Sequence, residues 1–434
     1  MITTTAHRTD PSRRDAIIIG VGTMAAALCA PAVQAQAAAR LTDAGLVRIA
    51  TTAQNPVKRG EVAGVVTLVA VGGETVVNAV GVQDLESRVP MRRDTIFRIA
   101  SMTKPICAVA ALMLVEQGKL VLDEPVDKWL PELANRQVLR AIDSPLDNTM
   151  PATRAITLRD LMTLRMGIGM ITDPPDKYPI QTAMADAGLQ PGPPFSEGPD
   201  VFMQRLGALP LIHQPGTHWM YHTGLDVLGV LIARASGIAL SEFMQTRIFA
   251  PLGMTDTAFF VPEAKIARLA TSYQRDPQTN ALTVLDPARG GLFAQAPAFE
   301  QGGGGLVSTV DDYLAFAQIL VNAGRGGGQQ LLSADSIAQM TTDQITSAQK
   351  AASPFAPGFW DTNGWGYGVS MTTAPDNISA TPGRLGWSGG YGTTFIADPS
   401  ANLIAIMLLQ RAMESPDDVA LHEVFATEVY HALS

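Results

Sequence analysis

The chain has 434 residues, of which 47% are hydrophobic and 16% charged, so it has enough apolar material for a sizeable core. Its formal net charge is −9 and it has no run of Lys or Arg, which argues against nucleic acid and anionic membrane surfaces as partners. The length fits two or three domains, or one large body with two lobes.

The first 35 residues are expected to be an export signal. Arg13 and Arg14 form a twin arginine, an apolar run follows over 16–30, and VQA at 33–35 offers the small residues of a cleavage site. The run is shorter than the about 20 residues that span a bilayer, although an uncleaved anchor is the alternative. We therefore expect a periplasmic or secreted protein with no membrane span after signal removal.

The expected elements place strands at both ends of the chain and helices between them. Two β-branched runs around Gly72 and Gly73 predict a hairpin, and an apolar run that ends at Gly118 predicts a buried helix. In chain order we expect a helix over 41–57, strands over 62–71 and 74–82, a helix over 105–118, loops and short helices over about 125–300 with an apolar helix at 225–235, strands over 365–371, 384–397 and 403–409, and a helix over 416–433.

This order predicts an α+β fold, in which one antiparallel sheet is built from both chain ends and flanked by helices, beside a mostly helical second lobe. After the signal at 1–35, residues 36–434 would form the domain. Its α/β lobe would take about 41–100 and 300–434, and its helical lobe about 105–300. A cleft between two such lobes is a usual place for a small-molecule site.

Residues 386–392 (GWSGGYG) contain the pattern G-x-S-x-G, which in α/β-hydrolases marks a catalytic serine. Such a serine lies on a tight turn from a strand into a helix, whereas the residues after Ser388 (GGYGTTFIADP) predict a continued strand. The short remainder of the chain also leaves no room for the elements that carry the acid and the histidine. Ser388 is therefore not expected to be a nucleophile.

Ser101 is a stronger candidate, because it forms the pattern S-x-x-K with Lys104. Residues three apart share a helix face, so the hydroxyl and the amine can meet. Pro105 is tolerated only in the first turn of a helix, which places Ser101 at an N-terminus where free N–H groups and the helix dipole would stabilise an oxyanion. Apolar neighbours would lower the pKa of Lys104. The alternative is a capping serine followed by a surface lysine.

Two further stretches could complete a site around Ser101. Tyr221 lies at an expected loop–helix junction and could relay protons beside Lys104, the alternative being a core tyrosine. On a late strand, Gly389 and Gly390 would let a substrate lie close to the backbone, and the Gly390 N–H could be a second oxyanion donor.

In this order and spacing, Ser101-x-x-Lys104, Tyr221-x-Thr223 and Trp387-x-Gly389 resemble the motifs of the serine β-lactamase and penicillin-binding protein superfamily. Within it the chain looks most like the class C β-lactamase-like esterases, the family VIII carboxylesterases. Longer stretches such as DTIFRIASMTKP and PGTHWMYHTGLDVLGVLIARASG are similar too, and the resemblance covers roughly residues 45–432. It implies the same fold as the element order does.

The resemblance also implies roles for individual residues. Ser101 would form an acyl-enzyme, and Lys104 and Tyr221 would share the base and acid roles. The N–H groups of Ser101 and Gly390 would form the oxyanion hole. The substrate site would be lined by Thr223, Trp387, Ser388, Gly389 and Gly390.

Two positions depart from the pattern of enzymes that process β-lactams. Thr223 stands where those enzymes typically have Asn, and Trp387 stands where they have a Lys that helps to bind the substrate carboxylate. Arg384, close by in sequence, could replace that cation only in part. Both departures favour a neutral, apolar acyl ester, and W-x-G is typical of the esterase branch.

No metal or other cofactor is expected. His213, His218 and His222 lack the regular spacing and the carboxylate of a metal site. The glycines at 302–305 are not followed by Gly-Lys-Ser/Thr, so they are expected to end a strand near the cleft rather than to bind phosphate. Cys107, the only cysteine outside the signal, is expected in the core.

Three functions remain open at this point. The first is a serine esterase for short or medium acyl chains. The second is a β-lactamase or D-alanyl-D-alanine carboxypeptidase or transpeptidase, and the third is a non-catalytic binding protein of the same fold. The intact Ser101, Lys104 and Tyr221 argue against the third. The expected partner is a small-molecule ester or β-lactam-like substrate, and the oligomeric state stays open.

Overall fold

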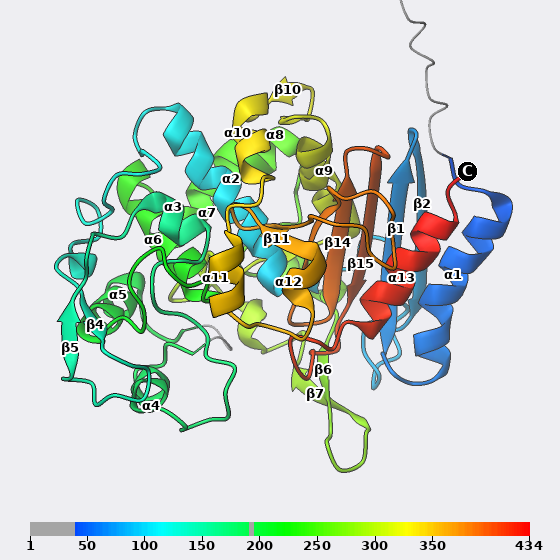
Figure 1. The fold of residues 1–434 in the computed structure, drawn as a ribbon. Helices are drawn as coiled ribbons and strands as arrows, with labels where there is room; N and C mark the ends of the chain where they lie inside the picture. Colours follow the sequence, from blue (N-terminus) through cyan, green and yellow to red (C-terminus); the bar gives the residue numbers. More distant parts are fainter. Residues whose placement is uncertain (1–39, 191–194) are drawn as a thin grey trace, which may run out of the picture. The chain divides into compact units, whose positions relative to one another are not determined.

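In the computed structural model, seven strands form one antiparallel sheet whose members come from both ends of the chain (Figure 1). The structure describes residues 40–190 and 195–434, so the predicted export signal lies outside the described residues. From one edge to the other the strands are β11 (Asn363–Trp365), β12 (Ser370–Thr372), β13 (Leu385–Gly389), β14 (Thr393–Asp398), β15 (Leu403–Leu409), β1 (Gly64–Val71) and β2 (Glu74–Gly81). The predicted α+β fold is confirmed.

Within this sheet the first strand in the chain pairs with the last. β1 and β15 run antiparallel from Val65 opposite Leu409 to Val71 opposite Leu403. β1 turns directly into β2 through Gly72 and Gly73, whose φ angles of 59° and 85° favour glycine. This pairing joins the two ends of the chain into one scaffold.

Side chains alternate between the two faces of the sheet and fill two separate cores. On one face, residues such as Val65 and Met407 pack under α1 (Asp43–Lys58) and α13 (Ala420–His431), which lie side by side (Figure 1). On the other face, residues such as Phe395 join the larger core with α2 (Thr103–Glu116) and α9 (Val310–Val321). We call these the outer and the inner face.

The middle of the chain is mostly helical, as predicted. It contains α3 (Leu158–Met162), α4 (Pro179–Asp186), α5 (Pro199–Ala208), α6 (Thr223–Ser236), α7 (Leu240–Met244) and α8 (Ala250–Leu252), with the ribbons β4 (Gln137–Leu139) with β5 (Thr149–Pro151) and β6 (Ser272–Arg275) with β7 (Leu282–Asp286). α6 packs against both α2 and α3, and it ends at Gly237, which has a left-handed conformation. Later come α10 (Ala334–Met340), α11 (Ser347–Ala352) and α12 (Phe359–Thr362).

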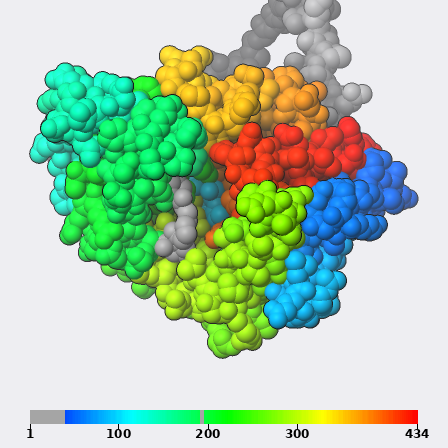
Figure 2. Space-filling view, turned by 90° about the horizontal axis from the view of Figure 1, so that it is seen from below, coloured from blue at the N-terminus to red at the C-terminus, as the bar shows by residue number. Residues whose placement is uncertain are grey.

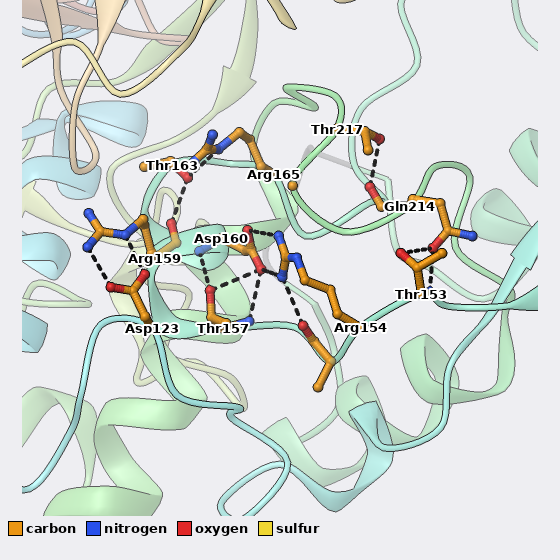
Figure 3. A network of polar contacts seen from close by, with 12 residues as sticks. Asp123, Thr153, Arg154, Thr157, Arg159, Asp160, Thr163, Arg165, Gln214 and Thr217 are labelled. Atoms are coloured by element: carbon orange, nitrogen blue, oxygen red, sulfur yellow. Dashed lines mark hydrogen bonds and ion pairs between the residues drawn. The ribbon is translucent and has the colours of Figure 1, made fainter.

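A polar network fixes the short helix α3 against its surroundings (Figure 3). Asp160, which is buried, accepts hydrogen bonds from the Thr157 amide at 2.9 Å and from both terminal nitrogens of Arg154. Thr157 in return accepts from the Asp160 amide, which closes a capping box. The chain after α3 then hydrogen-bonds along residues 216–221, so this network braces the segment that ends in Tyr221.

Two stretches predicted as strands each contain two strands. The stretch 365–371 turns between β11 and β12, where Gly366 donates to the Val369 carbonyl. The stretch 384–397 reverses between β13 and β14, and Gly392 has a φ of 90° there. Gly390 and Gly392 of GWSGGYG thus lie in the turn between these strands, while Gly386 and Gly389 belong to β13.

Among the described residues, no single helix is long and apolar enough to cross a membrane. One bent pair, Thr223–Ser236 with Leu240–Leu252, meets the criteria of length and composition when its two helices are taken together.

Candidate active site

Ser101 lies in a tight turn that leads into α2. The turn is a short 3₁₀ helix, Ala100–Met102, which packs against β13 and β14. Ala100 has a φ of 42°, a strained value for a residue with a side chain, and the Ile99 amide anchors the turn on the Leu306 carbonyl at 3.0 Å. Such strain is typical of functional turns, and it holds Ser101 at the positive end of α2.

Lys104 is fully buried one turn further along and contacts Ser101. Its Nζ lies 2.9 Å from Ser101 Oγ, 2.6 Å from the Gly303 carbonyl oxygen and 3.2 Å from His222 Nδ1. Burial disfavours the ammonium form and lowers the pKa of Lys104 to about 7. A substantial fraction of the amine is therefore neutral near pH 7 and can accept a proton.

The glycines at 302–305 support Lys104 through close packing and do not end a strand. A Cβ on Gly302 would come 2.5 Å from the Leu225 carbonyl oxygen, and one on Gly303 would come 2.7 Å from Asp226 Oδ1. Only glycine lets this backbone approach α6 so closely, which brings the Gly303 carbonyl to Lys104.

His222 and Asp226 form a second layer behind Lys104. His222 Nε2 lies 3.0 Å from Asp226 Oδ2, and Asp226 Oδ1 accepts the Gly303 amide at 2.8 Å. Burial, followed by the nearby Lys104, lowers the pKa of His222, so the imidazole is neutral at pH 7. The sequence pattern raises only metal binding as a role for His222 and predicts no role for Asp226. The spacing of four residues at the start of a helix was the available signal.

Tyr221 completes the group around Ser101. Its hydroxyl contacts Ser101 and accepts a hydrogen bond from Trp387 Nε1 at 2.7 Å, and its ring centroid lies 4.5 Å from Lys104 Nζ. Burial raises the pKa of Tyr221 above its ordinary value, so the phenol keeps its proton at neutral pH. Its carbonyl accepts the Met170 amide at 2.9 Å, which fixes its place.

An aromatic wall stands beside Tyr221. Trp387 stacks at 6.3 Å on Phe355 and meets Phe359 edge-on at 5.9 Å, and these three side chains are half-buried. Trp365 lies behind Trp387 and is fully buried. The surface beside the nucleophile is thus apolar and aromatic where a cation would serve a charged substrate.

The two glycines after Trp387 differ in their surroundings. A Cβ on Gly389 would come 2.2 Å from the Ile99 carbonyl oxygen, so β13 can meet the Ser101 turn only with glycine there. A Cβ on Gly390 would meet no atom within 4 Å, so the end of β13 is open. The Gly390 N–H, which the sequence predicts as the second oxyanion donor, belongs to this opening.

Three expected contributors do not join this group. Ser388 points to the outer face, where its hydroxyl lies 3.0 Å from Thr394 Oγ1 and 3.2 Å from His422 Nδ1. The expectation that its side chain lines the cleft is therefore corrected, because neighbours of Trp387 on a strand face the other way. Arg384 is paired with Asp376 and lies over the Tyr430 ring. Thr223 is buried, and its hydroxyl has no hydrogen-bond partner in the described part of the chain.

The histidines do not gather around one point. His213 stacks on His218 with ring centroids 3.6 Å apart, while His222 contacts Lys104 and Asp226. Across residues 40–190 and 195–434, no three His, Cys, Asp or Glu side chains come together as metal ligands would. Cys107 is a buried core residue, as expected.

The surface is hollowed between the green segments of the helical region and the red C-terminal segments (Figure 2).

The sequence matches the Beta-lactamase family over residues 49–427. The chain belongs to the β-lactamase family. The resemblance noted from the three motifs is thereby confirmed.

Individual relatives of the chain point the same way. Protein Rv1367c of Mycobacterium tuberculosis is 40% identical over 349 residues, which cover 79% of this chain and 84% of that protein. Esterase EstB of Burkholderia gladioli is 31% identical over 83% of this chain and 90% of its own. The solved structure of EstCE1, described as a hydrolase with promiscuous acyltransferase activity, has a TM-score of 0.73 at 25% identity and covers 89% of this chain and 99% of that one. This member of the family is a serine hydrolase.

Proposed function

We propose that this protein is a carboxylesterase that cleaves neutral esters of short or medium acyl chains through an acyl-enzyme on Ser101. The observation that carries the proposal is the Trp387 side chain, which donates to Tyr221 where enzymes that bind an anionic substrate would present a cation. Arg384 offers no free charge there, since Asp376 pairs with it. The esterase EstB and the hydrolase EstCE1 among the relatives support ester substrates.

Acylation would begin with neutral Lys104, whose Nζ lies 2.9 Å from Ser101 Oγ. As Oγ bonds to the ester carbonyl carbon, its proton passes to Nζ and the carbonyl oxygen becomes an oxyanion. The N–H groups of Ser101 and Gly390 stabilise that charge. The bond to the alcohol oxygen then breaks, and the departing oxygen takes a proton from the Tyr221 hydroxyl.

Deacylation would reverse these proton movements. Lys104, as ammonium, returns a proton to Tyr221, so both groups regain their resting state. Water then attacks the acyl carbon and gives up its proton to Lys104, and the ester bond to Ser101 Oγ breaks as Lys104 passes that proton to Oγ. An alcohol that replaced the water would accept the acyl group, which is the kind of acyl transfer ascribed to EstCE1.

The test uses the native enzyme with p-nitrophenyl acetate, butyrate, octanoate and palmitate beside a chromogenic cephalosporin. We expect turnover of the shorter esters, little of the palmitate and none of the cephalosporin. Quenching during turnover followed by peptide mass spectrometry should place the acyl group on the peptide that contains Ser101. Cephalosporin turnover at rates equal to ester turnover would favour the β-lactamase alternative, and an adduct on another residue would refute the mechanism.

We also propose export through the twin-arginine signal at residues 13–14, as the sequence pattern suggests. Replacing both arginines by lysine should hold the protein in the cytoplasm, whereas the native chain should be found in the periplasm or the medium. Equal distribution of the two proteins between the fractions would refute this route.

A further inference from the structure

Among the described residues the Lys104 amine has three polar neighbours, and only the role of His222 depends on where its ring proton lies. The Gly303 carbonyl oxygen, 2.6 Å away, can only accept a hydrogen bond. The His222 Nδ1, 3.2 Å away, accepts or donates according to which ring nitrogen carries the proton. The third neighbour is the Ser101 hydroxyl at 2.9 Å, the group that must lose its proton.

Asp226 decides the state of the imidazole. Its Oδ2 lies 3.0 Å from His222 Nε2, and a carboxylate can only accept, so the ring proton lies on Nε2. Asp226 itself is held by the Gly303 amide at 2.8 Å. His222 Nδ1 is therefore a bare acceptor that faces Lys104.

A neutral amine has two N–H bonds and one lone pair. With the Gly303 oxygen and His222 Nδ1 both accepting, the two N–H bonds of Lys104 are used, and the lone pair is left for the proton of Ser101. We infer that His222 and Asp226 form a positioning pair that aims the Lys104 lone pair at Ser101 Oγ. This inference rests on the proposed esterase function of the same site.

The same arrangement fits the amine after it has taken the proton. The ammonium has three donors and finds three acceptors: the Gly303 oxygen, His222 Nδ1 and the oxygen of Ser101. No neighbour has to rotate during proton transfer, which keeps the cost of reorganisation low.

The backbone at His222 shows that the chain is held in this arrangement against its local preference. His222 has φ 81° and ψ −70°, and the Thr223 amide donates to the Tyr221 carbonyl at 3.3 Å, which makes a γ-turn of the rare, strained kind. Strain of this sort persists where surrounding contacts over-determine it and is typical of active sites. Here it turns the imidazole toward α2, while the next residue begins α6.

The titratable groups around His222 come from three elements. Lys104 and Cys107 come from α2, Asp226 from α6, and Tyr221 from the loop before it, while the loop at Gly303 offers only backbone. Burial raises the pKa of Cys107 and of Tyr221, so both are neutral around pH 7. The charges that act on His222 are those of Lys104 and Asp226.

The decisive variant is Asp226→Asn. Its amide oxygen can keep the bond from the Gly303 amide, while its NH₂ donates to His222 Nε2 and drives the ring proton to Nδ1. Nδ1–H then competes with Ser101 for the lone pair of Lys104. We expect kcat for ester hydrolysis, measured on its high-pH plateau, to fall about 100-fold with KM little changed.

The high-pH plateau of kcat distinguishes a positioning role of Asp226 from an effect of its charge on the pKa of Lys104. The Asp226 charge raises the pKa of Lys104, so its removal lowers that pKa and moves the acidic limb of the pH profile to lower pH. If Asp226 acted only through its charge, Asp226→Asn would keep the native plateau. An unchanged plateau would therefore overturn the inference.

Two matched variants test the role of His222, the second residue of the positioning pair. In His222→Asn the amide can place an oxygen where Nδ1 lies, and Asn tolerates a positive φ. In His222→Gln the amide reaches the place of Nε2 instead and leaves no acceptor for Lys104. We expect Asn to retain at least tenfold more kcat than Gln, with thermal unfolding of both as the folding control; equal losses in two folded variants would contradict the inference.

A readout that does not depend on activity is the tautomer itself. Nitrogen-15 NMR of histidine-labelled protein should show the His222 proton on Nε2 in the native chain and on Nδ1 in Asp226→Asn, with His222→Asn identifying the signal. A native proton on Nδ1 would refute the pair even in an active esterase. If the native protein turned over no ester, the proposed function would fail while this spectrum still decided the inference.

Discussion

In the described part of the chain, two serines lie against a buried nitrogen base, on opposite sides of one sheet. Ser101 lies 2.9 Å from Lys104 Nζ on the inner face, and Ser388 lies 3.2 Å from His422 Nδ1 on the outer face. Both pairs would satisfy a search for a nucleophile beside a base. Their surroundings nevertheless differ in the backbone groups near the hydroxyl and in the hydrogen bonds of the base.

Ser101 precedes a helix and lies next to the open end of β13, so backbone N–H groups are available for an oxyanion. Ser388 lies within strand β13, opposite Thr394, and its hydroxyl contacts Thr394 as well as His422. His422 uses its other nitrogen on the Gly392 carbonyl at 2.9 Å, so no carboxylate accepts a hydrogen bond from that nitrogen. A serine beside a base is therefore expected to act as a nucleophile only where backbone N–H groups can also stabilise the oxyanion.

The largest expected effect is the difference between replacing Ser101 and replacing Ser388. Ser101→Ala should lower kcat/KM on p-nitrophenyl butyrate by about 10⁴-fold or more, because no acyl-enzyme can form. Ser388→Ala should remain within about twofold of the native enzyme, because it removes a structural hydrogen bond on the far face. Steady-state kinetics on both purified variants, with circular dichroism as a folding control, check the pair. The reverse ranking would overturn the assignment of the nucleophile.

The next largest effect concerns the base beside Ser101. Lys104→Met should reduce kcat by about 10³-fold, within the range that general bases contribute. In the native enzyme kcat/KM should rise with pH through about 7 and then level off, because the neutral amine is the active form. A flat native profile between pH 5 and 9 would show that Lys104 is not the titrating base.

The same variant should be more stable than the native chain near neutral pH. The pKa of Lys104 falls from 10.5 in the unfolded chain to about 7 in the folded one, so between these values the unfolded chain binds more protons. Native stability relative to Lys104→Met should thus rise with pH in that window, by up to about 1.4 kcal/mol per pH unit. Urea titrations at pH 7 and pH 9 measure this difference, and a constant gap would contradict it.

Much of the fold could be predicted, because β-branched runs at both chain ends and the apolar run before Gly118 carry strong periodic signals. The spacing of Ser101 and Lys104 predicted their contact, and the resemblance of the Tyr221 motif predicted the third group that the structure brings to them. The sheet face on which Ser388 lies could also be predicted, since successive side chains of a strand point to opposite faces and Trp387 is its neighbour. The contact of His222 with Lys104 was not, because it depends on a strained γ-turn that periodicity cannot indicate.

A smaller effect is expected when the indole of Trp387, which takes the place of a cation, is replaced. Trp387→Phe keeps an aromatic ring but removes the N–H that donates to Tyr221 at 2.7 Å, and we expect kcat to fall by up to about tenfold. Trp365→Phe is the matched control, because Trp365 Nε1 has no hydrogen-bond partner among the described residues. A drop of equal size in both variants would mean that ring packing, rather than the hydrogen bond, matters.

The smallest effect on activity is expected on the outer face. His422→Asn should shorten the side chain and lose the bond to the Gly392 carbonyl, which costs about 1–3 kcal/mol when a buried partner is left unsatisfied. Because Gly392 belongs to the turn after β13, the end of that strand should loosen, and the loss should be seen in thermal unfolding. Activity per folded molecule should remain within about threefold, since no reacting atom touches His422. Loss of activity as deep as that of Lys104→Met, in a folded protein, would show that the two serine–base pairs are not functionally distinct.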